Sequence, residues 1–240
     1  MRNVNLALLA CLVTTVCLGQ SAKKTTTSSG HTAHTTSAAC GVKCGQERWD
    51  IKTLTDPDAT IFKNATATDA TVAQLISQTP PAKLADTRDD SEKHLYHVHA
   101  LLIGWKIEKG TSSGTTIPDL DFHMVIADPK NTKKQMIIEV PNPSCKGVCR
   151  SAFLNKFKVA RTTVTSKLGN PTGDMVELPK PWVIDVTGPG FFDFSHRQDG
   201  LAPNCIEIHP VLEISFVQQK SNGPVHVNKA SELPHHCATR

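Results

Sequence analysis

The sequence predicts a mainly β domain with one main helix, arranged as a five-stranded OB-fold-like barrel. Five segments carry the apolar pattern of strands, and one amphipathic helix lies between the third and the fourth of them. Three strands, a helix and then two strands is the order of the OB-fold, a small five-stranded barrel. An open α+β sheet is the alternative, because strand order alone does not establish closure.

The second and third predicted strands are expected to form a hairpin. Their link, Asp128–Thr132, is rich in turn-forming residues. In a hairpin symmetric about Asn131, His123 lies opposite Glu139. The predicted strands are Leu95–Glu108, Asp121–Ala127, Gln135–Val140, Trp182–Thr187 and Cys205–Phe216.

The main helix is predicted over Cys149–Leu168, where apolar residues recur at three- and four-residue steps and form one face. Gly169 and Pro171 follow and end it. A second, shorter helix is predicted over Thr71–Ser77, with Asp69 as its N-cap. The apolar face of the main helix consists of Phe153, Phe157, Ala160, Val164 and Leu168.

The N-terminal residues 1–19 have the features of a cleavable signal peptide. The apolar run Leu6–Leu18 is too short to span about 30 Å of hydrocarbon, and cleavage is expected after Gly19. Residues 20–46 are Ser/Thr-rich and are predicted to be a disordered linker. Residues 47–218 are the predicted OB-like domain, which starts with a short strand over Arg48–Leu54, and 219–240 are a C-terminal tail. The mature protein is therefore expected to be secreted or periplasmic.

Six cysteines remain after removal of the signal peptide, and in an exported chain they indicate disulfides rather than zinc. Their CxxxC spacings do not match the knuckles of a zinc ribbon. Cys44 precedes the first strand and Cys145 follows the third, so these two are predicted to pair, and Cys145–Cys149 is the alternative. The six are Cys40, Cys44, Cys145, Cys149, Cys205 and Cys237.

A single core is predicted from the inward faces of the strands and the helix. The opposite faces of the second, third and fifth strands are expected to be exposed to solvent. The predicted core residues are Phe122, Met124, Ile138, Phe153, Phe157, Ile206, Ile208 and Leu212.

Polar side chains on the outward faces form the first candidate site. In an OB barrel the second strand neighbours the third and the third neighbours the fifth, so these side chains share one surface. Imidazoles and carboxylates on adjacent strands are suited to a metal site or to acid–base chemistry. A solvated strand face is the alternative. The residues are Asp121, His123, Glu139, Glu207 and His209.

These residues divide into two predicted roles. The candidate ligands of a divalent metal, which is the one cofactor that the sequence suggests, are His123, Asp121, Glu139 and His209. His209 is also the candidate catalytic base, with Glu207 or Glu139 as its orienting carboxylate.

The link between the last two strands carries the second candidate site. Gly188-Pro189-Gly190 allows a bulge or a close backbone approach. Asp193 and His196 follow as further catalytic candidates, since long connections of barrels often carry function. Turn formation by the side chains of Asp193 and Asn204 is the alternative.

Three segments and a short leader form a signature. The longest segment, Gly188–Leu212, has the pattern GxGFFDxxHxQxGxAPNxIEIHPVL, and the others are Asp121–Asp128, Met136–Cys145 and the leading Glu47-Arg48-Trp49. Together they resemble a family of exported bacterial proteins of unassigned function. The chain departs from the family at Arg197, where the family has glycine. The resemblance covers most of Cys44–Phe216 and implies no activity.

A binding or structural module of the envelope or extracellular space fits these features best. A metal-dependent hydrolase, resembling a phosphodiesterase or nuclease, is the alternative, so the sequence leaves open whether the protein is an enzyme. HExxH, nucleophile-elbow, P-loop and dinucleotide-loop motifs are absent from the sequence. The ligand is expected to be polyanionic or oligomeric. Nucleic acid has little support, because the net charge is only +4 and few rings lie on the predicted strands.

Overall fold

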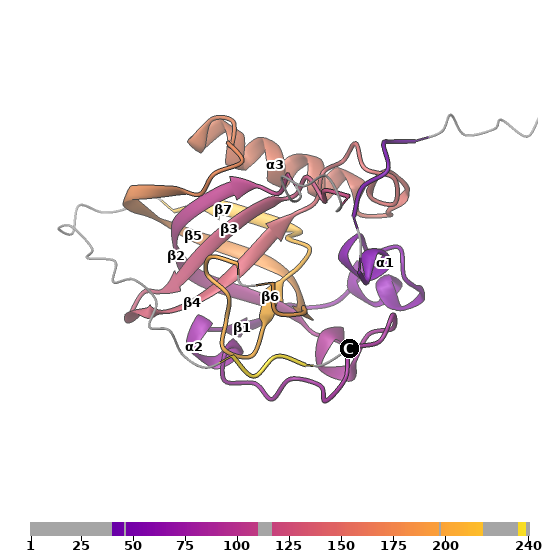
Figure 1. Ribbon diagram of the computed structural model, residues 1–240, viewed down its shortest axis with the longest axis horizontal. Coiled ribbons are helices and arrows are strands. Elements are labelled where there is room, and N and C mark those ends of the chain that lie inside the picture. Colours follow the sequence, from indigo (N-terminus) through magenta and orange to yellow (C-terminus); the bar gives the residue numbers. More distant parts are fainter. Residues whose placement is uncertain (1–39, 46, 110–116, 197, 218–234, 239–240) are drawn as a thin grey trace, which may run out of the picture. The chain divides into compact units, whose positions relative to one another are not determined.

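The computed structural model describes residues 40–45, 47–109, 117–196, 198–217 and 235–238. In this part of the chain the protein is mostly β, with a seven-stranded mixed sheet and α3 as the main helix (Figure 1). This confirms the predicted class. The strands are β1 (Thr68–Ala70), β2 (Leu95–Ile107), β3 (Phe122–Asp128), β4 (Asn131–Val140), β5 (Val176–Phe192), β6 (Ile206–Ile208) and β7 (Glu213–Phe216). The helices are α1 (Trp49–Lys52), α2 (Val72–Leu75) and α3 (Leu154–Leu168), with 3-10 turns at Pro57–Lys63, Asp90–Lys93 and Val148–Arg150.

The strands pair in the order β1-β2-β3-β4-β6-β5-β7, and β2 also pairs with β5. The pairings of β2, β3, β4, β6 and β5 therefore return to β2. The β4–β6 pairing is parallel, whereas β2–β3, β3–β4, β5–β6 and β2–β5 are antiparallel. In the hairpin of β3 and β4 His123 lies opposite Glu139, as predicted. The turn itself is at Pro129-Lys130 and not around Asn131, and a register shift between Ala127 and Asp128 sets this pairing.

The strand count differs from the predicted five in two places. The short strand β1 pairs in parallel with β2. The predicted strand Cys205–Phe216 is two strands, because the chain between β6 and β7 contains Pro210, which has no N–H to continue a ladder. Both β6 and β7 pair with the long strand β5, at different positions along it.

The predicted strand Arg48–Leu54 is wrong, because this stretch contains the helical turn α1. The N–H groups of Lys52 and Thr53 donate to the carbonyls of Arg48 and Trp49 four residues earlier. Alternation over so few residues does not separate a strand from a single helical turn. The turn matters for the site, because it buries Arg48 and Lys52 together.

The two predicted helices are present. Helix α2 confirms the short one, although its N-cap is Thr71, which forms a capping box with Gln74, rather than Asp69. Helix α3 buries Phe157 and Val164 and is followed by Gly169 at a positive φ of 83°, as expected at a helix end. It lies toward one end of the strands in Figure 1.

All eight predicted core residues are buried, but they belong to two clusters rather than one. The larger cluster fills the space inside the sheet and contains Phe122, Met124, Ile138, Ile206 and Ile208. The smaller one contains Phe153, Phe157 and Leu212. The difference arises because the start of α3 packs against the cysteine-bearing N-terminal segment instead of the sheet interior.

Three disulfides attach the ends of the described chain to the segments that follow β4 and precede β6. Cys44–Cys145, with Cα atoms 5.4 Å apart, is the predicted pair. Cys40–Cys149 lies beside it, and Cys205–Cys237 holds part of the predicted C-terminal tail. The end of the predicted linker, residues 40–45, is therefore linked covalently to the segment that follows β4. The predicted signal peptide lies outside the described residues, and no described helix is long and apolar enough to cross a membrane.

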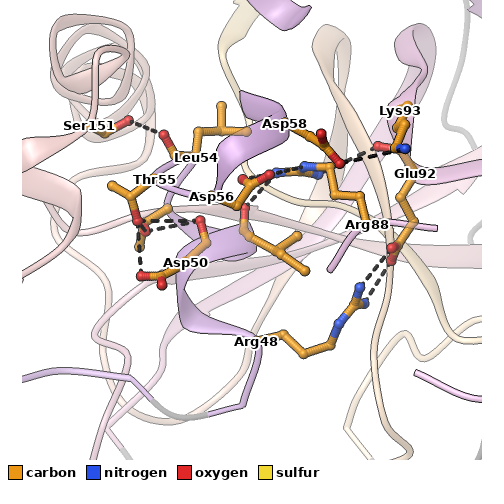
Figure 2. A network of polar contacts seen from close by, with 12 residues as sticks. Arg48, Asp50, Leu54, Thr55, Asp56, Asp58, Arg88, Glu92, Lys93 and Ser151 are labelled. Atoms are coloured by element: carbon orange, nitrogen blue, oxygen red, sulfur yellow. Dashed lines mark hydrogen bonds and ion pairs between the residues drawn. The ribbon is translucent and has the colours of Figure 1, made fainter. Parts of the chain in front are cut away.

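Two buried arginines fix the segment that precedes β2 (Figure 2). Arg48 donates to both oxygens of Glu92 at 2.7 Å and to the carbonyl of Phe192 at 2.7 Å. Arg88 donates to both oxygens of Asp56 at 2.9 Å. Such bidentate pairs hold two chain segments in one geometry. Helix α1 is thereby held against the end of β5.

Candidate functional site

Five predicted site residues lie together, but in the interior of the protein and not on a wet face. The exposed fraction is 0% for Asp121, His123 and His209, 1% for Glu207 and 4% for Glu139. The prediction that these strand faces meet solvent is therefore wrong. The predicted alternation of side chains along the strands is correct, since Met124 and Ile138 lie on the face opposite to the site and belong to the core. The site face is covered as well.

The connection between β5 and β6 forms one part of this cover. The carbonyl of Asp199 accepts a hydrogen bond from His123 Nε2 at 2.9 Å. Gly200 lies so close to β3 that a Cβ there would be 2.5 Å from Val125 Cγ1. Leu201 packs against Ile137 in a small cluster. The loop thus closes over β3 and β4 through contacts that alternation within those strands cannot reveal.

Helix α1 forms the other part of the cover. The ammonium of Lys52 is 3.0 Å from Asp193 Oδ2 and 3.7 Å from Asp119 Oδ2. The guanidinium of Arg48 lies 4.9 Å from the centre of the Phe191 ring, and that ring meets the His209 imidazole at 5.4 Å. A segment far upstream in sequence therefore seals the cluster from solvent.

Glu139 occupies the middle of the buried cluster. Its Oε1 is 3.0 Å from His123 Nδ1, and its Oε2 is 3.3 Å from His209 Nδ1. The first contact follows from the β3–β4 register, in which the two residues are partners. The second follows from the parallel pairing of β4 with β6, the strand that His209 directly follows. One carboxylate thus faces two imidazoles.

His209 is surrounded by carboxylates without good hydrogen-bond geometry. Its Nε2 is 3.4 Å from Asp121 Oδ2, and its Nδ1 is 3.6 Å from Glu207 Oε2. Among the described residues, both ring nitrogens, Asp121 Oδ2 and both oxygens of Glu207 have no hydrogen-bond partner. Asp121 Oδ1, by contrast, accepts from the N–H of Asn142 at 2.9 Å. Buried polar atoms without partners are rare and destabilising, and they indicate a missing ligand or proton.

The pKa values of the acidic groups shift in different directions, although burial acts on all of them in the same way. Burial raises the pKa of Glu207 to about 7 and that of Asp119 to about 7, and it also raises the pKa of Asp121. Burial acts on Glu139 in the same direction, but its hydrogen bond to His123 and the charge of His209 outweigh it and lower the pKa of Glu139 to about 2. Glu139 is thus the carboxylate that stays ionised.

The positive groups respond to this acidic surrounding. Burial disfavours the charged form of His209, but Asp121 and Glu139 outweigh it and raise its pKa to about 10. Burial likewise opposes the charge of Lys52, yet the nearby carboxylates, Asp193 first among them, raise the pKa of Lys52. The cluster therefore attracts positive charge strongly.

The loop candidates lie apart from His209. His196 is 36% exposed, with Nε2 3.1 Å from Glu47 Oε2 and 3.9 Å from Asp193 Oδ1. Asp193 is buried, with Oδ2 3.0 Å from the ammonium of Lys52. Its Oδ1 accepts from the N–H of the next residue at 2.8 Å. Asn204 has the alternative turn role, because its Oδ1 accepts from the backbone N–H two residues on at 3.3 Å, and its amide donates to one carbonyl at the end of α2 and one just after it.

Three residues of the cluster were not found from the sequence. Glu108 could have been found, because the β2–β3 register pairs Ile107 with Phe122 and so brings Glu108 next to Asp121. Asp119 precedes β3 in a stretch whose sequence has no pattern that predicts a site residue. Lys52 resembles any surface lysine in sequence, and only the helical turn and the tertiary contacts of α1 reveal it.

Three groups of side chains place possible metal-ligand atoms within 4.8 Å of one another in the described chain. Two of them contain Glu139, and the third contains the loop candidates Asp193 and His196. The groups are Asp121–Glu139–His209, Glu108–His123–Glu139 and Glu47–Asp193–His196.

Comparison of the chain with known protein families, with characterised proteins and with solved structures gives no match. The resemblance to a family of exported bacterial proteins stays a prediction.

Proposed function

We propose that this protein is an exported, OB-fold-like binding module that holds a divalent cation at Asp121, Glu139 and His209. The observation that carries the proposal is the buried His209, whose two ring nitrogens face carboxylates without a hydrogen bond. Buried imidazole and carboxylate groups of this kind are ordinary ligands of transition metals.

The OB-like arrangement is supported by the pairings of the strands. Strands β2, β3 and β4, helix α3 and then β5 and β6 follow one another in the expected order. A closed five-stranded barrel needs five pairings that lead from one strand around to the same strand. The pairings β2–β3, β3–β4, β4–β6, β6–β5 and β5–β2 meet this requirement. Strands β1 and β7 extend this ring at its edges.

The charges of the cluster support a cation. Lys52, Arg161 and the two imidazoles supply at most four positive charges to five carboxylates. Uncompensated charges in a protein interior are strongly unfavourable, so either protons or a cation must make up the difference. A divalent cation does so in the smallest volume. The five carboxylates are Asp119, Asp121, Glu139, Asp193 and Glu207.

The distances support Asp121 and His209 as neighbouring ligands, and Glu139 offers an oxygen within 4.8 Å of both. Tetrahedral ligands at about 2.1 Å from a metal lie about 3.4 Å from one another, and His209 Nε2 lies 3.4 Å from Asp121 Oδ2. Glu207 Oε2 lies 3.6 Å from His209 Nδ1. A carboxylate in that place orients a metal-binding imidazole and increases its basicity.

Binding is favoured over hydrolysis because the ligand side chains are covered. A hydrolase must admit water and substrate to its metal, whereas His209 and Asp121 are fully buried beneath α1 and the β5–β6 connection. The second candidate, a metal-dependent hydrolase, is favoured by one observation. Burial raises the pKa of Glu207 to about 7, which suits a general base at neutral pH.

Export is supported by the three disulfides, which form and persist in oxidising compartments. A secreted or periplasmic location is therefore part of the proposal, together with the signal peptide predicted from the sequence.

The test is the metal content of the oxidised protein, measured by plasma mass spectrometry after equilibration with Zn²⁺ or Mn²⁺ and removal of free metal. We expect bound metal in the wild type and less of it in His209→Ala. His99→Ala is the matched control, since His99 is exposed and paired with Asp185 elsewhere on the sheet. A wild type without metal, or a His209→Ala protein that binds as much as wild type, contradicts the proposal. Phosphodiesterase and nuclease assays with and without chelator decide between binding module and hydrolase.

A further inference from the structure

The carboxylate of Glu139 has two different environments, one on each oxygen. Oε1 faces His123 and, beyond it, Glu108, whereas Oε2 faces His209. The two groups of ligand atoms that contain Glu139 otherwise share no residue. The first adds Glu108 and His123, and the second adds Asp121 and His209. A carboxylate with a separate ligand set at each oxygen has the arrangement of a bridging ligand.

The hydrogen bonds of His123 define the first set. A backbone carbonyl only accepts, so His123 Nε2 carries the hydrogen that it donates to Asp199. In the neutral ring, Nδ1 then presents its lone pair to Glu139 Oε1 at 3.0 Å and to Glu108 Oε1 at 3.3 Å. Three electron-rich atoms thus converge. A cation between them satisfies all three, and Nε2–H donation to a carbonyl is the usual way to orient a metal-binding imidazole.

A proton on His123 Nδ1, in place of a cation, satisfies fewer of these three atoms. That proton serves Glu139, but among the described residues Glu108 Oε1 is buried and lacks a hydrogen-bond partner. Lys106 is its ion-pair neighbour at 3.3 Å, and the Lys106 side chain is 18% exposed. The lysine therefore compensates part of the charge of Glu108 from the outer side and leaves the inner side facing His123.

We infer that the cluster is a dinuclear centre in which Glu139 bridges two divalent cations. One cation is held by Asp121 and His209, and the other by Glu108 and His123. This inference rests on the proposed function and adds the second cation, its ligands and the bridge. In carboxylate-bridged pairs of this kind, the two cations lie about 3.5–4 Å apart.

The charges leave room for a second cation. Six carboxylates, two lysines and Arg161, which donates to the carbonyl of Leu120 beside Asp121, leave three negative charges when both imidazoles are neutral, as metal-binding imidazoles must be. One divalent cation leaves one of these charges uncompensated, and a second cation compensates it. The six carboxylates are Glu108, Asp119, Asp121, Glu139, Asp193 and Glu207, and the two lysines are Lys52 and Lys106.

The test is the stoichiometry of Zn²⁺ binding to metal-free, oxidised protein, followed by calorimetry and by native mass spectrometry. Two equivalents are expected. One equivalent overturns the dinuclear centre but retains the cation site at His209, whereas none overturns the proposed function as well. The two outcomes are therefore distinguishable.

The variants His123→Ala and His209→Ala are each expected to retain one equivalent, and His99→Ala is expected to retain two. A folded His123→Ala protein that still binds two equivalents overturns the assignment of the second ligand set. If either variant does not fold, Mn²⁺ bound to the wild type gives an independent reading by electron paramagnetic resonance. Two bridged ions give an exchange-coupled spectrum. An uncoupled six-line spectrum at two equivalents overturns the bridge by Glu139.

Discussion

Arg48 and Glu92, 44 positions apart in the sequence, share two hydrogen bonds of 2.7 Å in the interior of the protein. The same carboxylate accepts from the N–H of Phe192 at 2.9 Å, so it joins α1 to the end of β5. The adjacent Phe191 lies between the Arg48 guanidinium and the imidazole of His209. This pair therefore fixes the cover of the site.

Replacing Arg48 with Leu should destabilise the protein by about 3–5 kcal/mol, because it leaves the Glu92 carboxylate buried without its charge partner. Urea unfolding of the oxidised protein measures the effect. Arg150→Leu is the control, since Arg150 is exposed and its replacement should change stability by no more than about 0.5 kcal/mol. Similar losses in the two variants would contradict a special role of the Arg48–Glu92 pair.

Gly200→Ala should destabilise the loop that covers β3 by about 1–3 kcal/mol, because a Cβ at Gly200 would be 2.5 Å from Val125 Cγ1. Gly169→Ala separates this clash from backbone strain. Both glycines have φ near 80°, at 81° and 83°, but nothing lies within 4 Å of a Cβ at Gly169. We expect the loss of stability to be larger at Gly200, and equal losses would show that strain alone acts.

The metal-free protein should become less stable as pH rises from 5 to 8. The pKa of Glu207 is about 7 in the folded protein and near 4.5 in the unfolded chain, so the folded state binds the proton more tightly. The stabilisation is complete below about 4.5 and is lost as pH rises through about 7. Asp119 acts in the same direction. The contribution of His209, with a raised pKa of about 10, is lost only at higher pH, from about 6.5 to 10.

Thermal unfolding with chelator present measures this dependence. Glu207→Gln removes one titrating carboxyl, so its melting temperature should change less between pH 5 and 8 than that of the wild type. An equal slope in the two proteins would exclude Glu207 as a source of the effect. Added Zn²⁺ should oppose the loss at pH 8, where the carboxylates are ionised and free to bind it.

Removal of both N-terminal disulfides, Cys40–Cys149 and Cys44–Cys145, by replacement with Ser should lower stability more than removal of Cys205–Cys237. The two N-terminal bridges close nearly the same loop, of 109 and 101 positions, so either one alone still restrains it, whereas the C-terminal bridge spans 32 positions. The chain-entropy model gives at least about 1 kcal/mol more for the longer loop, and denaturant unfolding of the two variants provides the comparison. The reverse order would mean that the C-terminal bridge stabilises the folded state by contacts and not through the unfolded chain.

The sequence predicts the register of the site better than its environment. The pairing of His123 with Glu139 was predicted from the period of two and from a turn-rich link, both of which are local properties, although a register shift beside Asp128 sets it in the structure. The burial of these residues depends on α1 and on the Asp199 carbonyl, which are distant in sequence and carry no pattern that points to the sheet. Tertiary contacts therefore decide whether a polar strand face is a solvated surface or an interior centre.

Local pattern also fails where an element is short. Arg48–Leu54 alternates and still forms a helical turn, and the last predicted strand divides at Pro210. By contrast, β2 was predicted to within one residue at each end, because many residues contribute to its pattern. Length is not sufficient, since α3 begins at Leu154 and not at Cys149, and β5 extends over Val176–Phe192 where only Trp182–Thr187 was predicted. The predicted Cys44–Cys145 pair is present, although Cys44 precedes the helical turn α1 and not a strand.

A disulfide lies close to each segment that covers the site. Cys44–Cys145 joins the stretch before α1 to the segment that follows β4, and Cys205–Cys237 joins the end of the β5–β6 connection to residues 235–238. Both bridges restrict the motion of the cover, so exchange of a cation between the centre and bulk solvent depends on rare local openings. The exchange half-life of an isotopically labelled cation would then measure the rate of these openings. Reductant that cleaves the bridges should shorten it, which makes the residence time of the cation sensitive to the redox state of the compartment.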